Sequence, residues 1–426
     1  MFPGFLQFNG LEIINTSRAA AYARALGITD VACDCDGLRR ALDDDEYTSV
    51  DSNNAPWWDP AMRDSKDFAG FVGLEVTGLS KSAASRGIVP LTTGGAALHP
   101  LRRVHREIQF RVLALAKTEC ALSYGISWLA AALRGSGCNI DCGGDQMCFF
   151  TCCPSCDDET DPAEPDPCFD NATRYWRTVY NTGLLSMEDP TNIQRVSGGW
   201  IAELTFTMAA GDPYIYREPV VVADGPRPDQ ILPNYEDPGL PPECDEPTDC
   251  LSDPLSPCPP PPLPPLPPVP VDRCWPTGPF TAARVIMPIP RDQLATWAES
   301  VPLITIDSGS RSLRRVTVRW YDNPIGQNCV TDLNPCGACA EVNVSYIPRR
   351  STFVLDGRLE TATVDCPGGF GFRTAQPSIY GRGGTPFVWP VFSCTTGACL
   401  EIIAQANSVA DDLYIQVSYV QREDAV

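Results

Sequence analysis

The sequence predicts a mainly β protein of two folded units, each a β-sandwich, with one helix in the first unit. Many short segments alternate apolar and polar side chains with the period of two that half-buried strands require. One stretch spaces its apolar residues as a helix does. A proline-rich segment divides the chain, and its 426 residues exceed the usual size of a single core.

The first unit, residues 1–225, is defined by two long strands and the helix. Glu107–Ala116 and Trp200–Met208 each place apolar side chains on one face and polar side chains on the other, so both predict two-faced strands. Shorter strands are expected at Phe71–Val76 and Gly87–Leu91. The helix is predicted at Glu119–Arg134. Its apolar face would consist of Leu122, Ile126, Leu129 and Leu133, with Gly135 ending it.

The second unit, residues 280–426, is predicted to consist almost entirely of strands. They are expected at Arg315–Trp320, Val342–Ile347, Thr352–Leu355, Arg358–Val364, Leu400–Ala404 and Leu413–Tyr419. The Asp356-Gly357 dipeptide suits the positive φ values of a two-residue type I′ hairpin turn. Strands of this length separated by turns favour a β-sandwich.

Residues 226–279 form a proline-rich linker, including the run PCPPPPLPPLPPVP from Pro257 to Pro270. Proline has a fixed φ and no backbone donor, so such a run extends as a semi-rigid spacer. The alternative is a docking motif for a groove lined with aromatic side chains.

Composition excludes several classes of protein. The net charge of -21, from 32 basic and 53 acidic residues, argues against specific nucleic-acid binding, which needs clustered Lys and Arg. The longest uncharged apolar stretch, Tyr124–Leu133, is too short for membrane insertion as a helix. The N-terminal segment lacks the basic and apolar regions of a secretory signal, so we expect a protein made and kept in a cytoplasm.

No catalytic or cofactor-binding residue is expected. The two histidines, His99 and His105, have no serine or metalloprotease motif to serve, and no phosphate-binding glycine loop occurs. The acidic clusters Asp43–Glu46 and Asp157–Asp166 lack the spacing of a calcium loop and are interpreted as solvated, with calcium as the alternative. No carboxylate pair is singled out for glycoside hydrolysis. The sequence therefore predicts a protein that is not an enzyme.

The most unusual feature is a cysteine-rich insertion at about residues 136–170. Its seven cysteines are Cys138, Cys142, Cys148, Cys152, Cys153, Cys156 and Cys168. A loop rich in Gly, Pro and Asp cannot bury a core of its own, so we expect disulfides, with zinc or reduced thiols as alternatives. Cys153–Cys156 and Cys336–Cys339 have the C-x-x-C spacing of zinc ligands. Because seven is odd, a distant partner, a free cysteine or a metal must account for one thiol.

Three smaller pairs could close individual loops among the chain's 20 cysteines. They are Cys33 with Cys35, Cys244 with Cys250, and Cys394 with Cys399. Connectivity does not follow from spacing, so these pairings are hypotheses.

The order of these features resembles the distal tail proteins, or minor tail proteins, of long-tailed siphoviruses that infect actinobacteria. The resemblance begins with FVGLEVTGL, the loop SAASRGIVPL and the turn TTGGAAL, followed by the long strand and the helix, within Phe71–Gly135. It continues with AELTFTMAAGDPYIY at Ala202–Tyr216 and with APWWDP at Ala55–Pro60. The cysteine-rich insertion and the proline-rich linker depart from the family pattern.

The resemblance implies a structural protein of the virion tail tip, assembled in the host cytoplasm. The first domain would form a homo-oligomeric ring, usually hexameric, that joins the tail tube and tape measure to the tip or baseplate hub proteins. Release by lysis into an oxidising medium would allow the cysteines to pair. A ring lined with carboxylates would let DNA pass without sticking, a hypothesis that rests on charge.

The resemblance also implies that the second domain is a galectin-like β-sandwich. This leaves a carbohydrate-binding adhesin as the alternative function, with Trp320, Tyr380, Phe387 and Trp389 as aromatic side chains that could stack on a sugar. Fold alone does not establish such binding, because these side chains could equally pack in the core.

Overall fold

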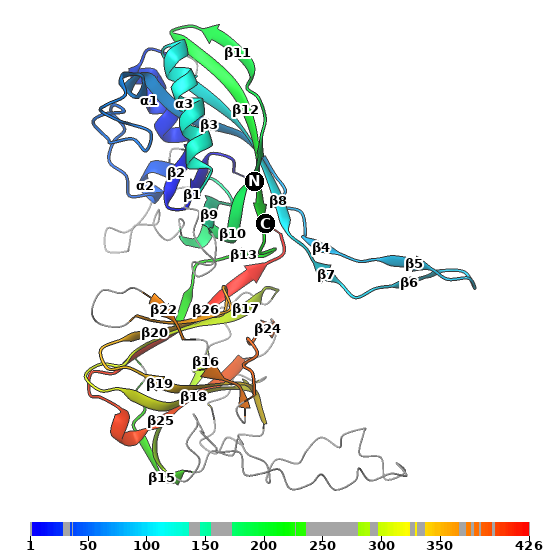
Figure 1. The fold of residues 1–426 in the computed structure, drawn as a ribbon, viewed down its shortest axis with the longest axis vertical. Helices are drawn as coiled ribbons and strands as arrows, with labels where there is room; N and C mark the ends of the chain where they lie inside the picture. The colour runs from blue at the N-terminus through cyan, green and yellow to red at the C-terminus, as the bar shows by residue number, and fades with distance from the viewer. Residues whose placement is uncertain are drawn as a thin grey trace, which may run out of the picture. The chain divides into compact units, whose positions relative to one another are not determined.

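The chain divides into two compact units in a computed structural model: unit 1 is Met1–Glu218 with Gln421–Val426, and unit 2 is Pro219–Val420. The structure describes residues 2–28, 35, 37–135, 145–154, 173–225, 227–235, 280–289, 297–323, 329, 337–365, 372–375, 379–382, 385–393 and 397–425. The predicted mainly β class is confirmed (Figure 1).

Unit 1 combines long antiparallel strands with short helices. Its strands are β1 (Phe5–Phe8), β2 (Leu11–Asn15), β3 (Phe68–Thr77), β8 (Arg106–Ala116), β9 (Asp145–Phe150), β10 (Trp176–Met187), β11 (Thr191–Val196), β12 (Gly199–Ala210) and β13 (Ile215–Tyr216). Four short strands form a separate ribbon: β4 (Ala84–Ser85), β5 (Ile88–Pro90), β6 (Ala96–Leu98) and β7 (Arg102–Arg103). The helices are α1 (Thr16–Ala25), α2 (Leu38–Ala41), the 3₁₀ helix η1 (Arg63–Asp67) and α3 (Glu119–Ala132).

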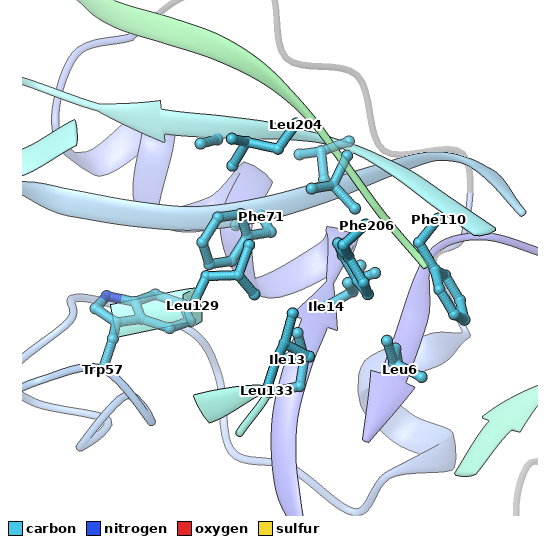
Figure 2. Packing of buried hydrophobic residues seen from close by; sticks show 14 of the residues in the cluster. Leu6, Ile13, Ile14, Trp57, Phe71, Phe110, Leu129, Leu133, Leu204 and Phe206 are labelled. Carbon is cyan, nitrogen blue, oxygen red and sulfur yellow. The ribbon is translucent and has the colours of Figure 1, made fainter. Parts of the chain in front are cut away.

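The centre of unit 1 is the antiparallel sheet β3–β8–β12, in which β8 pairs with β12 along the whole length of β8. The strands predicted at Glu107–Ala116, Trp200–Met208 and Phe71–Val76 all occur here. One face packs against α3 and buries Phe71, Phe110, Leu204 and Phe206, which Figure 2 shows gathered with Leu129 of the helix. Strand β10 pairs with both β9 and β12, so it joins β1, β2 and β9 to this sheet.

Helix α3 lies where the sequence predicts a helix. The Thr118 side chain caps its first turn by accepting a hydrogen bond from the Ala121 amide at 3.1 Å. Leu122, Leu129 and Leu133 are buried as expected, and Ile126 packs at the edge of the core. The helix ends at Ala132, two residues before the expected end, and Gly135 follows with φ +74°.

Helix α1 and strands β1 and β2 were not predicted. The Asn15 side chain accepts a hydrogen bond from the Arg18 amide at 3.0 Å and thereby starts α1. The helix is rich in alanine, so it lacks the alternation of large apolar and polar side chains that identifies an amphipathic helix.

Unit 2 contains β14 (Val220–Asp224), β15 (Gln230–Tyr235), β16 (Phe280–Ile289), β17 (Glu299–Asp307), β18 (Leu313–Asn323), β19 (Ala338–Ile347), β20 (Thr352–Asp356), β21 (Thr361–Asp365), β22 (Phe372–Thr374), β23 (Ile379–Tyr380), β24 (Phe392–Ser393), β25 (Gly397–Gln405), the 3₁₀ helix η6 (Ala406–Ser408) and β26 (Tyr414–Glu423). One sheet has the order β15–β16–β25–β18–β19–β23, and the strands β26–β17–β20–β21–β22 lie in the other. Their buried side chains form one core, which includes Trp320, Ile402, Leu355 and Val417. Each strand predicted for this unit is present.

The hairpin predicted around Asp356-Gly357 exists, but the predicted type I′ turn is wrong. Residues 357–360 connect β20 to β21, and the positive φ occurs at Glu360 (+51°). Asp356 remains in the strand and accepts a hydrogen bond from the Arg358 amide at 2.9 Å. Gly357 is required for space, because a Cβ atom there would lie 2.8 Å from the Pro302 carbonyl oxygen.

The range 226–279, expected as a linker, contributes β15 near its start, which pairs with β16. Residues 236–279, with Cys244, Cys250 and the polyproline run, lie outside the described residues. None of the helices in the described part of the chain is long and apolar enough to cross a membrane.

Candidate interaction surfaces

The most exposed feature of unit 1 is the ribbon Ser80–His105, called the arm below. Strand β4 pairs with β7, and β5 pairs with β6. Every residue from Ser85 to His105 is exposed, and Figure 1 shows the arm extending away from the sheet of unit 1. The strand expected at Gly87–Leu91 is β5 of this arm. A two-stranded ribbon that packs on nothing has at best marginal stability in water.

The arm is both apolar and basic. Ile88 and Leu98 face each other across β5 and β6 and are 65% and 62% exposed. Its basic side chains are Lys81, Arg86, Arg102 and Arg103, and no acidic residue occurs between Glu75 and Glu107. In a chain of net charge -21, this makes the arm opposite in sign to the remainder. Exposed apolar side chains in such a setting mark a surface for a protein partner.

Arg106, at the first position of β8, fixes the root of the arm. Its guanidinium donates to the carbonyl oxygens of Gly78 at 2.9 Å, Lys81 at 2.6 Å and Pro213 at 2.8 Å. It also donates to the Asp424 carbonyl oxygen. Burial lowers the pKa of Arg106, and the nearby Asp424 and Asp212 carboxylates oppose this effect. The arm therefore leaves unit 1 from a firmly held base.

The face of the β3–β8–β12 sheet opposite α3 is polar over residues Glu107–Arg111 of β8. The Arg111 guanidinium lies 3.3 Å from the Glu75 carboxylate and 3.4 Å from the Glu203 carboxylate. Asn192 of β11 donates to Glu203 at 2.8 Å. Glu107 and Gln109 are exposed on the same face. The sheet thus buries one face in its own core, and part of its other face is a hydrogen-bonded, net acidic surface next to the apolar Leu113 and Ile201.

Unit 2 has a pocket of about 470 Å³ beside β19. The residues that line it include the apolar Trp389, Val388 and Pro386, and Glu341 and Arg382 supply charged groups. Glu341 is held by Arg319, whose Nε donates to its carboxylate at 2.7 Å. The Arg382 Nε lies 3.8 Å from the same carboxylate.

Of the aromatic side chains proposed to stack on a sugar, only Trp389 lines the pocket. Trp320 is completely buried in the core, so the sugar-stacking prediction for it is wrong. Phe387 packs against the indole of Trp389, with 4.8 Å between the ring centroids, and lies at the edge of the core. Tyr380 lies on β23 and is half-buried.

Two disulfides are present among the described cysteines: Cys35–Cys153 and Cys329–Cys399. Cys153 has a distant partner, which is one of the three solutions expected for the odd cysteine count. It is therefore not a zinc ligand with Cys156. The suggested local pairs Cys33–Cys35 and Cys394–Cys399 are wrong, because Cys35 and Cys399 bind other cysteines.

Cys120, Cys148, Cys152 and Cys339 are free thiols. Burial raises the pKa of Cys148 to about 11, whereas Cys120 and Cys339 are exposed. The remaining zinc candidates, Cys138, Cys142, Cys156, Cys168 and Cys336, lie outside the described residues. Among the residues that the structure describes, no group of three or more His, Cys, Asp or Glu side chains could hold a metal ion.

Both histidines lie on the arm side of unit 1 and are exposed. His99 is in the loop after β6, and the Nε2 atom of His105 lies 3.2 Å from Glu107. The acidic cluster Asp43–Glu46 is not simply solvated, because Asp44 binds Arg18 at 3.0 Å and accepts a hydrogen bond from Tyr47. Asp157–Asp166 lies outside the described residues.

No protein-family model matches the sequence, and no curated protein matches it. Among solved structures, the chain is similar to the Dit protein of phage SPP1, described as "a Paradigm of Hub Adsorption Apparatus in Gram-positive Infecting Phages". The two chains are 11% identical, and the TM-score is 0.40 over 83% of this chain and 93% of that chain.

Proposed function

We propose that the chain is a non-enzymatic structural protein of the siphovirus tail tip, of the distal tail protein kind found in actinobacteriophages. Unit 1 forms a homo-oligomeric ring, hexameric in the simplest case. The ring joins the tail tube and tape measure to the tip or baseplate hub proteins in the virion, after assembly in the host cytoplasm. The sequence resemblance within Phe71–Gly135 and Ala202–Tyr216 supports this proposal.

The observation that carries the proposal is the arm. An isolated ribbon with Ile88 and Leu98 exposed gains its stability by packing on another chain. The arm is basic and the chain as a whole is acidic, so opposite charges favour a second copy of this chain as the partner of the arm. A contact between different surfaces of identical subunits closes into a ring when the rotation between them closes.

The polar part of the β3–β8–β12 sheet supports the proposal that this face of the sheet lines the bore of the ring. Its charged side chains, Glu75, Glu107, Arg111 and Glu203, sum to a negative charge. A bore lined by these side chains would repel the phosphate backbone, so DNA could pass through it without binding.

Placing charge at the tip of the arm is expected to dissociate the oligomer. Burying Ile88 and Leu98 would contribute about 1.5 to 3 kcal/mol each. Their replacement in Ile88→Asp/Leu98→Asp should therefore weaken each subunit contact by about 100-fold or more. Sedimentation and negative-stain electron microscopy of the full chain would show closed rings for the natural sequence and monomers for the variant.

The matched control is Ile231→Asp/Val388→Asp, which changes two exposed apolar residues of unit 2. It should still form rings. A natural chain that sediments as a monomer at every concentration tested would refute the ring, and rings that persist in the arm variant would refute the role of the arm.

The pocket in unit 2 favours a second function, carbohydrate binding by the galectin-like unit. Trp389 offers an apolar ring face, and Glu341 and Arg382 offer hydrogen-bonding groups at the same pocket. Host cell-wall polysaccharide should bind the full chain, and Trp389→Ala should reduce the affinity at least 10-fold. Trp297→Ala, a change at an exposed tryptophan that does not line the pocket, should leave binding intact. Equal affinities in all three chains would exclude this site.

A further inference from the structure

Strand β11 is an edge strand within the described part of unit 1. It pairs with β12 and with no other described strand. Thr191–Arg195 is exposed throughout. An exposed strand edge presents unpaired amide and carbonyl groups, and proteins usually cover such an edge or protect it with charge or proline. Arg195 is the single charged residue of β11. The edge is therefore open to another chain.

The surface around β11 complements the arm in chemistry. We call Leu185–Val196, the end of β10 together with β11, the edge ribbon. Leu185 and Ile193 are 57% and 53% exposed on it, and the connection between its strands carries the exposed Glu188 and Asp189. An apolar surface with acidic residues beside it matches an arm that is apolar with basic residues beside it.

The edge ribbon is held in place beneath this surface. Leu184 and Met187 pack against the core of unit 1. The Glu188 amide donates to the Thr205 carbonyl oxygen at 2.9 Å. A partner would thus meet a surface that is already ordered, which lowers the entropy cost of binding.

The arm and strand β11 of the edge ribbon lie at opposite ends of the same sheet. The arm enters β8 at Arg106, which pairs with Ala210 at the end of β12. Strand β11 of the edge ribbon pairs with the start of β12, at Gly199–Glu203, and the end of β10 pairs with Phe206 and Thr207. Strand β8 has 11 residues, so at the usual rise of a strand the far end of β11 lies about 35 Å from the root of the arm, and Leu185 lies about 10 Å from it. In Figure 1 the arm also points away from β11. The arm of a chain therefore leads away from its own β11.

We propose that the arm of one copy covers the edge ribbon of the next copy, with Ile88 and Leu98 on Leu185 and Ile193. The basic side chains Arg86 and Arg102 then lie beside Glu188 and Asp189. This inference rests on the proposed homo-oligomer and names the surface that receives the arm. The contact joins two different patches, so it is head-to-tail, and each copy gives one arm and receives one.

Charge reversal with rescue tests the pairing in the full-length chain. Arg86→Glu/Arg102→Glu and Glu188→Lys/Asp189→Lys should each place like charges together and weaken assembly at least 10-fold, measured by sedimentation at low ionic strength. The chain with all four substitutions should recover assembly to within about threefold of the natural chain, because the arm and the edge ribbon again carry opposite charges. Arg311→Glu/Arg349→Glu, a reversal at two exposed residues of unit 2, should assemble normally.

The outcomes separate the two proposals. A natural chain that is monomeric contradicts both the ring and its contact. A natural ring that the Glu188→Lys/Asp189→Lys chain forms equally well leaves the ring intact and overturns the edge ribbon as its receiving surface. Loss of assembly in both charge-reversed pairs without recovery in the fourfold variant also overturns the direct pairing.

Discussion

Removing residues 421–426 should destabilise unit 1 by at least about 3 to 5 kcal/mol, the cost of breaking a buried ion pair by deleting one partner. This segment returns from the end of unit 2 and completes unit 1. Glu423, only 4% exposed, lies 3.5 Å from the buried Arg177 and also binds Arg217. Without the segment, Arg177 keeps a buried charge with no carboxylate beside it.

Backbone contacts add to this effect. Tyr216 and Ile215 of β13 pair with Arg422 and Glu423 of β26. The Arg217 amide donates to the Gln421 carbonyl oxygen at 3.0 Å, and the arm-root residue Arg106 donates to Asp424. Loss of the segment therefore removes the end of β26 that pairs with β13, and it loosens the base of the arm. Total stabilities of proteins are about 5 to 15 kcal/mol, so unit 1 should be largely unfolded under mild denaturing conditions.

Urea unfolding of the chain ending at Val420, followed by tryptophan fluorescence, would measure the loss. Glu423→Gln in the full-length chain isolates the charge, because it keeps the shape of the side chain and the backbone pairing. Glu107→Gln is the matched control, since Glu107 is exposed and such a change usually alters stability by less than about 0.5 kcal/mol. If Glu423→Gln unfolds at the same urea concentration as Glu107→Gln, the buried pair does not stabilise unit 1.

The long strands could be predicted because their signal is local. In β8 and β12 every second side chain faces the core, and this period is visible in the sequence regardless of which strands pair. Helix α1 carried no comparable signal, because its buried residues include three alanines and an arginine. Burial of Ala19, Ala20 and Ala23 depends on close packing by distant residues, and a local pattern does not contain that information.

Features that depend on distant contacts could not be predicted. The Glu423 to Arg177 pair joins residues more than two hundred positions apart, and it is one of the contacts that hold the chain end on unit 1. The arm was predicted as a strand and a turn. Its exposure could not be predicted, because apolar residues such as Ile88 and Leu98 are also typical of a buried core. Similarly, Trp320 on β18 and Trp389 beside the pocket are both aromatic residues in sequence, and only the fold separates the core residue from the pocket residue.

The Cys35–Cys153 disulfide is expected to raise the stability of unit 1 by about 2 to 5 kcal/mol. It spans 118 residues, and closing so long a loop removes much conformational freedom from the unfolded chain. The native cluster around it is small: Phe5, Cys35, Leu38, Ala41 and Phe150 form its buried part. Helix α2 has only one turn, so the cross-link replaces the packing that a longer helix would provide.

The full-length Cys35→Ser/Cys153→Ser chain should melt about 5 to 15 °C below the natural chain. Protease should also cut near Leu38–Ala41 first. The control is Cys120→Ser, which removes an exposed free thiol and should not change the melting temperature.

At pH 8, alkylation should reach Cys120 and Cys339 but not Cys148, because burial raises the pKa of Cys148 to about 11 and keeps it a protonated thiol.

Reduction of the disulfides in the natural chain is the second part of the test of the Cys35–Cys153 disulfide. A reductant should lower its melting temperature towards that of Cys35→Ser/Cys153→Ser, and any further loss would report Cys329–Cys399, which spans 70 residues of unit 2. A tail protein assembled in a reducing cytoplasm would then gain this stability only after release into an oxidising medium. Identical melting curves for the oxidised, reduced and substituted chains would contradict the stabilising role, because closure of a loop of this length must reduce the entropy of the unfolded state wherever the native geometry is unstrained.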